Sequence, residues 1–380
     1  MSSTEPAVSE IADGRVGVCG VDETPPVSFE QALIAAHSDV ADNRTATRFT
    51  RQWSHAMREA ERMPNRPSII LDCDPGHDDV IAIVVAANAT DLLGITTVAG
   101  NAPLDRTTHN ACVMREMLGL GVGVHSGAAR PLVAEPLSAT YVHGESGLDG
   151  ADLPVPERGP DSVDAVGFII ETCRSTEGVW LVATGPLTNV ALAMRAAPDL
   201  AGRVAGISLM GGGTFGNRTA MAEFNLWADP EAAAIVFGCG VPLTMAGLDV
   251  THQFIVDTPR IAQVAALGGR LPTVLADLFR FFASRYVARH DDMAGAALHD
   301  PLAVLALTHP DLFTGTDRHV SIETSGIHTR GMTAIDRRAL VERPAPNCHV
   351  LEHVDSDAAW NIVIESIVAA GDRSEVGHRG

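Results

Sequence analysis

The stretch Ser68-Ile-Ile-Leu-Asp-Cys-Asp-Pro-Gly-His-Asp-Asp79 sets the expectation for the whole chain. Its first part, residues 68–72, is a short apolar run of the kind found in buried strands of parallel sheets. Pro75 and Gly76 then turn the chain, and residues 78–87 carry apolar side chains at helical spacing. The stretch therefore predicts a buried strand that leads directly into a helix.

Four aspartates lie within this stretch, at positions 72, 74, 78 and 79. On a strand, Asp72 and Asp74 point to the same side, whereas Asp78 and Asp79 open the next helix, where negative charge suits the helix dipole. Packed carboxylates repel one another unless they are protonated or bind a cation, and oxygen ligands favour Ca²⁺ or Mg²⁺. The pattern predicts a metal site. The alternative is that some aspartates only cap the helix or pair with arginines, and Asp72 alone is readily structural.

Apolar runs and helical patterns alternate along the rest of the chain. We expect strands at residues 92–99, 179–183, 207–210 and 243–246, and helices from residue 188 and at 229–237, 272–288 and 356–370, the last ending at Gly371. This alternation predicts the α/β class, with a mostly parallel, twisted, Rossmann-like open sheet and helices on both faces. Ligands bind such sheets at the carboxyl ends of strands, where the aspartates, Asn101 and Thr184 are expected.

The first part of the chain has a different composition. Residues 1–43 carry eight acidic residues and one arginine, and residues 44–66 carry six arginines. Short helices are expected at 29–40 and 49–63. We interpret residues 1–66 as an N-terminal extension, partly helical or disordered, and residues 67–380 as one domain.

Composition excludes several kinds of protein. All 27 basic residues are arginines and the formal net charge is −20, which excludes lysine Schiff-base chemistry and a Walker A loop and argues against nucleic-acid binding. Six cysteines without a CxxC pair argue against zinc ribbons and predict reduced thiols in a cytoplasmic protein. Neither a signal peptide nor a membrane span is expected.

Three further polar motifs can carry chemistry. In His299-Asp300-Pro301 the carboxylate precedes a proline, so it is equally a helix N-cap. His143-Gly-Glu-Ser-Gly147 is polar and rich in glycine, which predicts a mobile loop. Glu223 and Asn225 can hydrogen-bond ligand hydroxyls, whereas Asp229 is expected only to cap a helix.

Together these motifs resemble those of the inosine–uridine-preferring nucleoside hydrolase family, from about residue 68 to the end of the chain. The most specific motif is Asp72-Cys-Asp-Pro-Gly-His-Asp-Asp79, and the others arrive in family order: Val98-Ala-Gly-Asn101, Thr184-Gly-Pro-Leu-Thr-Asn189, Met210-Gly-Gly-Gly213, Ala222-Glu-Phe-Asn225 and His299-Asp-Pro301. The resemblance implies Ca²⁺-dependent hydrolysis of the N-glycosidic bond of ribonucleosides to nucleobase and ribose, as in nucleoside salvage. It also implies a homodimer or homotetramer.

The resemblance implies a role for each matching residue. It assigns the metal ligands to Asp74, Asp79, the backbone carbonyl of Thr184, and Asp300, and makes Asp74 the general base for water as well. It places six residues around the ribose, the last two near its 5′-hydroxyl: Asp78, Asn101, Asn225, Met210, Asn217 and Glu223. His143 and His299 match histidines beside the nucleobase, and His299 would be the acid for the leaving base.

The chemistry of the reaction agrees with these residue types. Cleavage of the glycosidic bond develops oxocarbenium character at the ribose, a cation activates water, and a histidine can protonate the departing base near neutral pH. The first motif and the segment from His143 look most similar to the pyrimidine-preferring branch. However, residues 289–293 lack the aromatic side chain that relatives place near Asp291 to contact the base, and Tyr286 or His290 are possible substitutes, so the preferred base stays open between pyrimidine-preferring and broad.

Two other functions compete with this interpretation. An aspartate pair after a strand also suits haloacid dehalogenase-like phosphatases, but these need a downstream lysine that the chain lacks. A nucleoside- or sugar-binding protein without turnover would not need an intact base and acid, here Asp74 and His299.

Overall fold

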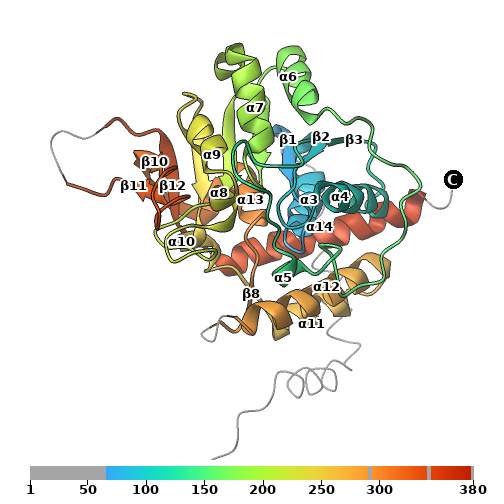
Figure 1. Cartoon of the computed structure of the whole chain (residues 1–380). Helices are drawn as coiled ribbons and strands as arrows, with labels where there is room; N and C mark the ends of the chain where they lie inside the picture. Colours follow the sequence, from blue (N-terminus) through green and yellow to red (C-terminus); the bar gives the residue numbers. More distant parts are fainter. Residues whose placement is uncertain (1–65, 290–292, 340–343, 378–380) are drawn as a thin grey trace, which may run out of the picture.

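The computed structural model describes residues 66–289, 293–339 and 344–377 (Figure 1). The helices expected at 29–40 and 49–63 lie outside the described residues, as does His290. The central sheet is formed by β1 (Ser68–Cys73), β2 (Asp91–Thr97), β3 (Gly123–Ser126), β4 (Trp180–Ala183), β5 (Gly206–Met210), β6 (Leu243–Ala246), β9 (Phe313–Arg318) and β12 (Cys348–Val354). Two small two-stranded sheets pair β7 (Ile255–Asp257) with β8 (Gly295–Ala297), and β10 (Val320–Ile322) with β11 (Thr333–Ile335).

Helices connect most of these strands. The α-helices are α3 (Asp79–Ala89), α4 (Leu104–Met117), α5 (Thr140–His143), α6 (Ala165–Ser175), α7 (Thr188–Ala196), α8 (Phe224–Ala228), α9 (Pro230–Phe237), α10 (Leu248–Thr251), α11 (Thr258–Ala266), α12 (Arg270–Val287), α13 (Pro301–Thr308) and α14 (Ser356–Gly377). Two 3₁₀ helices follow α7 and α13, at η1 (Pro198–Gly202) and η2 (Pro310–Leu312).

The strand order of the central sheet is β3-β2-β1-β4-β5-β6-β12-β9, and every neighbouring pair is parallel except β12 with β9. The predicted class is therefore confirmed: a mostly parallel open sheet in one α/β domain. Its first six strands follow the order 3-2-1-4-5-6 of the Rossmann fold, and the order reverses between β1 and β4. Ligands bind open α/β sheets at such a reversal.

Apolar packing covers the sheet on both faces. Alternate residues of β1 point to opposite sides, so Ile69 and Leu71 belong to one buried cluster and Ile70 to the other. The first cluster includes residues of α3, α4, α12, α13 and α14, and the second includes residues of α6, α7 and α9, which Figure 1 shows on opposite sides of the sheet. Because both faces are covered, β1 is buried almost throughout and only its ends are free to carry chemistry.

The sequence patterns missed or misplaced some elements. The strands β3, β9 and β12 were not expected, and the last helix continues past Gly371 to residue 377. Gly371 is not among the glycines with positive φ, so it lacks the left-handed conformation with which a glycine ends a helix. A glycine inside a helix costs only about 1 kcal/mol relative to alanine, which the packing of α14 against α3 and α12 offsets.

Composition led us to expect reduced cysteines and no membrane span, and both expectations can be compared with the described residues. Five cysteines there are free thiols, at positions 73, 112, 173, 239 and 348. No helix in residues 66–289, 293–339 or 344–377 is both long and apolar enough to cross a membrane.

Candidate active site

The carboxylates of the first motif lie where β1 passes into α3. β1 ends at Cys73, the turn follows, and Asp79 opens the helix. The backbone N–H of Gly76 donates to Asp79 Oδ2 over 2.9 Å, which ties the turn to the helix start. Asp78 occupies the N-cap position but its side chain makes no capping hydrogen bond. Its carboxylate is thus available for another partner.

Asp74 sits in a space that two glycines keep open. A Cβ on Gly100 would lie 2.0 Å from Asp74 Oδ2, and a Cβ on Gly185 would lie 2.5 Å from Oδ1. The backbone N–H of Asn101 donates to Oδ2 over 2.7 Å. Oδ1 is buried and has no hydrogen-bond partner among the described residues. One oxygen of Asp74 is therefore fixed by the backbone and the other is left for a ligand.

Asp79 joins the ends of three strands. Thr184, which follows β4, donates its hydroxyl to Asp79 Oδ1 over 2.8 Å. Asn101, which follows β2, donates its side-chain amide to Asp79 Oδ2 over 3.0 Å.

Asp300 comes from the start of α13, and its side chain makes no capping hydrogen bond, so the alternative that it only caps this helix is wrong.

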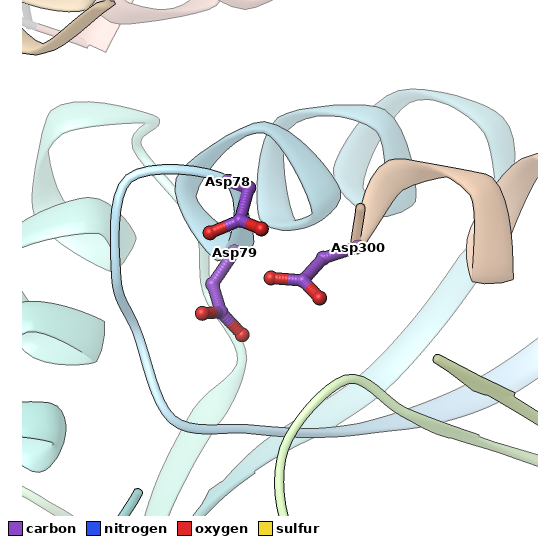
Figure 2. A group of neighbouring side chains, drawn as sticks. All are labelled: Asp78, Asp79 and Asp300. Atoms are coloured by element: carbon purple, nitrogen blue, oxygen red, sulfur yellow. The ribbon is translucent and has the colours of Figure 1, made fainter. Parts of the chain in front are cut away.

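Three of these carboxylates form a cluster that could hold a metal ion. One oxygen each from Asp78, Asp79 and Asp300 lie within 4.8 Å of one another, and Figure 2 shows the three groups converging on one space from α3 and α13. Burial, reinforced by the charge of Asp79, raises the pKa of Asp78 to about 8. Burial also raises the pKa of Asp74 and of Asp300 well above the usual range. Such groups stay ionised together only beside a cation.

The donor set fits a hard divalent cation. It consists of oxygens alone, and the buried Oδ1 atoms of Asp74 and Asp78 lack hydrogen-bond partners among the described residues. The backbone carbonyl of Thr184 already accepts from Asn225 Nδ2 over 2.8 Å, but a carbonyl oxygen has a second lone pair. Oxygen ligands of this kind suit Ca²⁺ or Mg²⁺.

Asp72 plays a different part from its neighbours. Its Oδ1 accepts from the hydroxyl of Thr96 over 2.6 Å and from Asn189 Nδ2 over 2.8 Å. Burial raises its pKa to about 6, while these two hydrogen bonds act in the opposite direction. It links β1 to β2 and α7 below the cluster, in line with the structural alternative. Asp229 caps α9 through Ala232, as expected.

Glu223 and Asn225 belong to a part of the pocket wall that is held by hydrogen bonds to backbone atoms. Glu223 is buried and accepts from the backbone N–H groups of Gly212, Asn225 and Leu226, so it caps α8. Burial raises its pKa to about 7, against these hydrogen bonds. Asn225 Nδ2 also reaches the carbonyl of Met210 over 3.2 Å. The Glu223 carboxylate thus holds the wall together as well as facing the pocket.

Aromatic and imidazole rings form another part of the lining, on or beside helices that pack outside the sheet. His143 closes the short helix α5 and is buried, so the expected mobile loop begins with an anchored residue. His299 Nδ1 lies 2.8 Å from the Thr251 hydroxyl, and its Nε2 lies 3.2 Å from the Tyr286 hydroxyl. The Tyr286 hydroxyl also lies 3.3 Å from His252 Nε2. The residue proposed as a substitute aromatic therefore does belong to this part of the lining.

These walls enclose a single pocket. Its lining contains ten of the twelve residues to which the family resemblance gave a role: Asp78, Asn101, His143, Thr184, Met210, Asn217, Glu223, Asn225, His299 and Asp300. Asp74 and Asp79 are not part of the lining but are hydrogen-bonded to Asn101, which is. The fold and pocket define an α/β protein in which clustered carboxylates and a group of aromatic and imidazole rings line one pocket.

Sequence reasoning missed several residues of the pocket lining: Tyr141, Phe282 and Arg289. It also gave no role to His77 or His252. His252 follows the short helix α10 and not the end of a strand, so the rule that found Asn101 and Thr184 does not mark it.

Known proteins share this fold and sequence. The sequence profile of the inosine-uridine preferring nucleoside hydrolase family matches residues 69–361. Pyrimidine-specific ribonucleoside hydrolases RihA of Salmonella arizonae and Escherichia coli are 43% and 44% identical over 304 residues, which cover 79% of this chain and 97% of each relative. A solved purine-preferring ribonucleoside hydrolase from Gardnerella vaginalis is 32% identical with a TM-score of 0.76, over 80% of this chain and 99% of that one. An inosine-guanosine nucleoside hydrolase is 26% identical with a TM-score of 0.73, over 79% and 98%.

The chain belongs to the inosine-uridine preferring nucleoside hydrolase family. It is a nucleoside N-ribohydrolase, an enzyme that cleaves the bond between ribose and nucleobase.

Proposed function

We propose that this enzyme is a Ca²⁺-dependent hydrolase of pyrimidine ribonucleosides, with uridine as a good substrate. The observation that carries the proposal is the pocket itself. Asp78, which has a buried oxygen without a partner, and Asp300 lie in its lining, and so do His143 and His299. A ribose fits the oxygen-rich end and a nucleobase fits the end with the rings, so the glycosidic bond would lie between them.

The metal ligands we propose are Asp74, Asp79, the Thr184 carbonyl and Asp300. The convergence of Asp79 with Asp300 supports the choice, and Asp78 beside them would hold a ribose hydroxyl. When bound, a divalent cation supplies Lewis-acid activation of water and fixes the ribose hydroxyls. Ca²⁺ accepts six to eight oxygens in flexible geometry, which suits a mixed set of carboxylates and a carbonyl.

Asp74 is proposed as the general base. Its Oδ2 is held by the Asn101 backbone, so the carboxylate cannot rotate freely, and its partnerless Oδ1 can take the proton of the attacking water. The water oxygen bonds to the anomeric carbon while the bond from that carbon to the base nitrogen breaks. The electron pair leaves with the base. Oxocarbenium character at the ribose develops next to the carboxylates, which stabilise positive charge.

His299 is proposed as the acid that protonates the departing base. Both its ring nitrogens face hydroxyl groups, those of Thr251 and Tyr286. A hydroxyl can donate or accept, so the hydrogen of the imidazole can lie on either ring nitrogen. We propose that the ribose is contacted by Asn101, Met210, Asn217, Glu223 and Asn225. Of these, Asn217 and Glu223 would lie near its 5′-hydroxyl.

The preference for pyrimidines rests on the relatives. Those 43–44% identical are named as pyrimidine-specific, whereas the purine-preferring structure is 32% identical. Free thiols support a reducing compartment, and we propose a cytoplasmic enzyme. We also propose a homodimer or homotetramer, which light scattering on the purified full chain tests.

The full chain with uridine and Ca²⁺ tests the proposal. We expect equal release of uracil, measured by chromatography, and ribose, measured as reducing sugar, with slower turnover of inosine. Release of phosphate from uridine 5′-monophosphate would indicate a phosphatase. Calorimetry with uridine detects binding without turnover. Calcium chelation should abolish ribose release, and Ca²⁺ should restore it better than Mg²⁺. Faster turnover of inosine than of uridine would contradict the pyrimidine preference. Binding of uridine without release of ribose would contradict hydrolysis.

The choice of sugar gives a second, matched test. Uridine and 2′-deoxyuridine share a base and leaving group, so they differ only at the end with the carboxylates. Losing one hydroxyl partner of buried polar groups leaves those groups unpaired, which typically costs on the order of 1–3 kcal/mol, or about 5- to 150-fold in rate. Equal rates on the two substrates would contradict a ribose bound at the carboxylates.

A further inference from the structure

The pocket contains an arginine, Arg289, that the proposed reaction does not use. The lining has the carboxylates of Asp78, Glu223 and Asp300, and Arg289 supplies the one guanidinium among its described residues. Within the part of the chain that the structure describes, this guanidinium pairs with no carboxylate, and its Nη1 donates to the carbonyl of Arg285 over 3.3 Å. A guanidinium has five N–H donors, so most of them are left for a ligand or for water.

The helix α12 places Arg289 at the outer end of the lining. Phe282, Tyr286 and Arg289 stand at helical spacing, so they share one face of the helix, and all three line the pocket. The backbone N–H of Arg289 donates to the carbonyl of Tyr286 over 3.0 Å, which continues the turn beyond the last residue of α12. Phe282 and Tyr286 are buried, whereas Arg289 is exposed. This face therefore runs from the interior to the mouth of the pocket.

The short helix α5, which packs against α12 (Figure 1), repeats this order. Its buried residue, His143, stacks on the ring of Phe282 with 5.5 Å between centroids. Its more exposed residue, Tyr141, lies under the guanidinium of Arg289, with 5.0 Å from Cζ to the ring centroid. Tyr141 is 39% exposed and His143 only 6%. The two pairs thus form an inner and an outer layer, and cation–π attraction holds the charge of the outer layer in place.

The two layers face different parts of a bound nucleoside. In the proposed function the ribose lies at the carboxylates, and both Asp78 and Asp300 are buried. The base extends from the ribose toward the rings, where the Tyr286 hydroxyl lies 3.2 Å from Nε2 of His299, the proposed acid for the departing base. Arg289 follows Tyr286 by one helical turn toward solvent. Its guanidinium is therefore placed for the edge of the base that is remote from the ribose.

We propose that Arg289 is a specificity-determining residue that donates a hydrogen bond to a carbonyl oxygen on this remote edge. The proposal rests on the proposed function, because it assigns the base to the end with the rings. In uracil the remote edge carries the carbonyl at C4, which accepts from a guanidinium. In cytosine it carries an amino group, which is a donor like the guanidinium itself. The enzyme then favours uridine over cytidine.

The same contact acts on the bond-breaking step. The electron pair of the glycosidic bond leaves with the base, and in uracil the carbonyl oxygens share the resulting negative charge. A cation beside the C4 oxygen stabilises this charge as it develops. A hydrogen bond strengthens when its acceptor becomes charged, so loss of Arg289 should lower kcat for uridine as well as raise KM. A contact made equally in the ground state and the transition state would change KM alone.

Arg289→Met tests the contact, because methionine keeps an unbranched apolar side chain and removes the donors. We expect the ratio of kcat/KM for uridine to that for cytidine to fall about tenfold, the loss typical of a hydrogen bond to a charged group. Arg285→Met is the matched control. The Arg285 guanidinium lies on the same helix, 5.2 Å from the ring centroid of Phe281, but Arg285 is not among the described residues of the lining. The control should keep the wild-type ratio, and an unchanged ratio in Arg289→Met would overturn the proposal.

A substrate without a group at C4 separates the base contact from general damage to the pocket. The riboside of 2-pyrimidinone has the same sugar as uridine and lacks the C4 oxygen. Comparing variant with wild type on each substrate removes the difference between their leaving groups. We expect Arg289→Met to lower kcat/KM for uridine about ten times more than for this riboside. Equal losses on the two substrates would make Arg289 a support for the pocket mouth and refute a contact with the base.

Tyr141→Leu tests what holds the guanidinium in place. Loss of the ring should lower the ratio of uridine to cytidine by less than Arg289→Met does. The double variant Tyr141→Leu/Arg289→Met should have the ratio of Arg289→Met alone, because residues that act through one contact are not additive. A further fall in the double variant would contradict the positioning role of Tyr141.

The wild-type chain separates this proposal from the proposed function. If it hydrolyses neither uridine nor cytidine, the proposed function itself fails. If it hydrolyses both and prefers cytidine, hydrolysis of pyrimidine ribonucleosides stands and the role of Arg289 is refuted.

Discussion

The two ends of the pocket are built in different ways. The end with the carboxylates comes from residues that directly follow β1, β2 and β4, and its hydrogen bonds join those strand ends to one another. The end with the rings comes from α5, α10, α12 and His299, which precedes α13, and the contacts of His299 and Tyr286 join side chain to side chain. The sheet thus fixes the atoms that break the bond, and peripheral helices fix those that meet the base.

This difference predicts different consequences for substitutions. A change at the carboxylate end should affect every substrate with a ribose, whatever its leaving group. A change at the ring end should affect natural nucleosides and spare an activated riboside. Each of the following experiments compares the two kinds of substrate.

The largest effect is expected for Asp74→Ala. The variant loses the proposed general base, which typically costs about 10²–10⁴-fold in rate, and a proposed metal ligand as well. We expect undetectable turnover of both uridine and p-nitrophenyl riboside, together with weaker Ca²⁺ binding by calorimetry. Asp105→Ala, which removes an exposed carboxylate on α4, is the matched control and should behave as wild type. Release of ribose at the wild-type rate by Asp74→Ala would refute both assignments.

The next largest effect is expected for His299→Ala. Without the acid, turnover of uridine should fall about 10²-fold or more, whereas p-nitrophenyl riboside, which leaves as a stabilised anion, should be little affected. Steady-state kinetics on the two substrates measures the ratio. Equal losses on both, with a rise in the Ca²⁺ concentration needed for activity, would instead make His299 a support for its neighbour Asp300.

A smaller effect is expected for Tyr286→Phe. This variant keeps the ring of α12 and removes only the hydroxyl that lies between His252 and His299. Losing one neutral hydrogen bond costs on the order of 1 kcal/mol, so kcat for uridine should fall about fivefold without a change for the activated riboside. A comparable fall on both substrates would mean that the hydroxyl supports the whole pocket.

The carboxylate end could be predicted from the sequence because one physical rule covers it. Parallel strands present their carboxyl ends at one edge, so polar residues after apolar runs are brought together there. Asp74, Asn101 and Thr184 were found in this way, and the structure joins them to Asp79 by hydrogen bonds. Asp300 alone needed the family resemblance, because a carboxylate before proline is so often a cap.

The ring end could not be predicted in the same way. Phe282 and Tyr286 recur at helical spacing on the apolar face of α12, and both are buried, so their pattern is that of ordinary core residues. Their position in the pocket depends on the packing of α12 against α5, and these two helices lie far apart in the sequence. Strand β9 was missed for a related reason: its residues are half-buried or exposed, so no apolar run marks it.

The smallest effect is expected from removing residues 1–60. We propose that residues 67–380 form the catalytic domain, because β1 begins at Ser68, the family match begins at residue 69, and each proposed site residue lies between Asp74 and Asp300. Both ends of the pocket should then be complete in the truncated chain. We expect kcat/KM for uridine and for p-nitrophenyl riboside to stay within about twofold of the full chain, which lies within the ordinary scatter of a distant change, ~0.5 kcal/mol. Thermal melting, checked alongside, shows whether the shorter chain is folded. If the truncated chain melts normally but loses activity on uridine alone, the extension contributes to the ring end. If it loses activity on both substrates and its mass in light scattering changes, the extension acts through the oligomer.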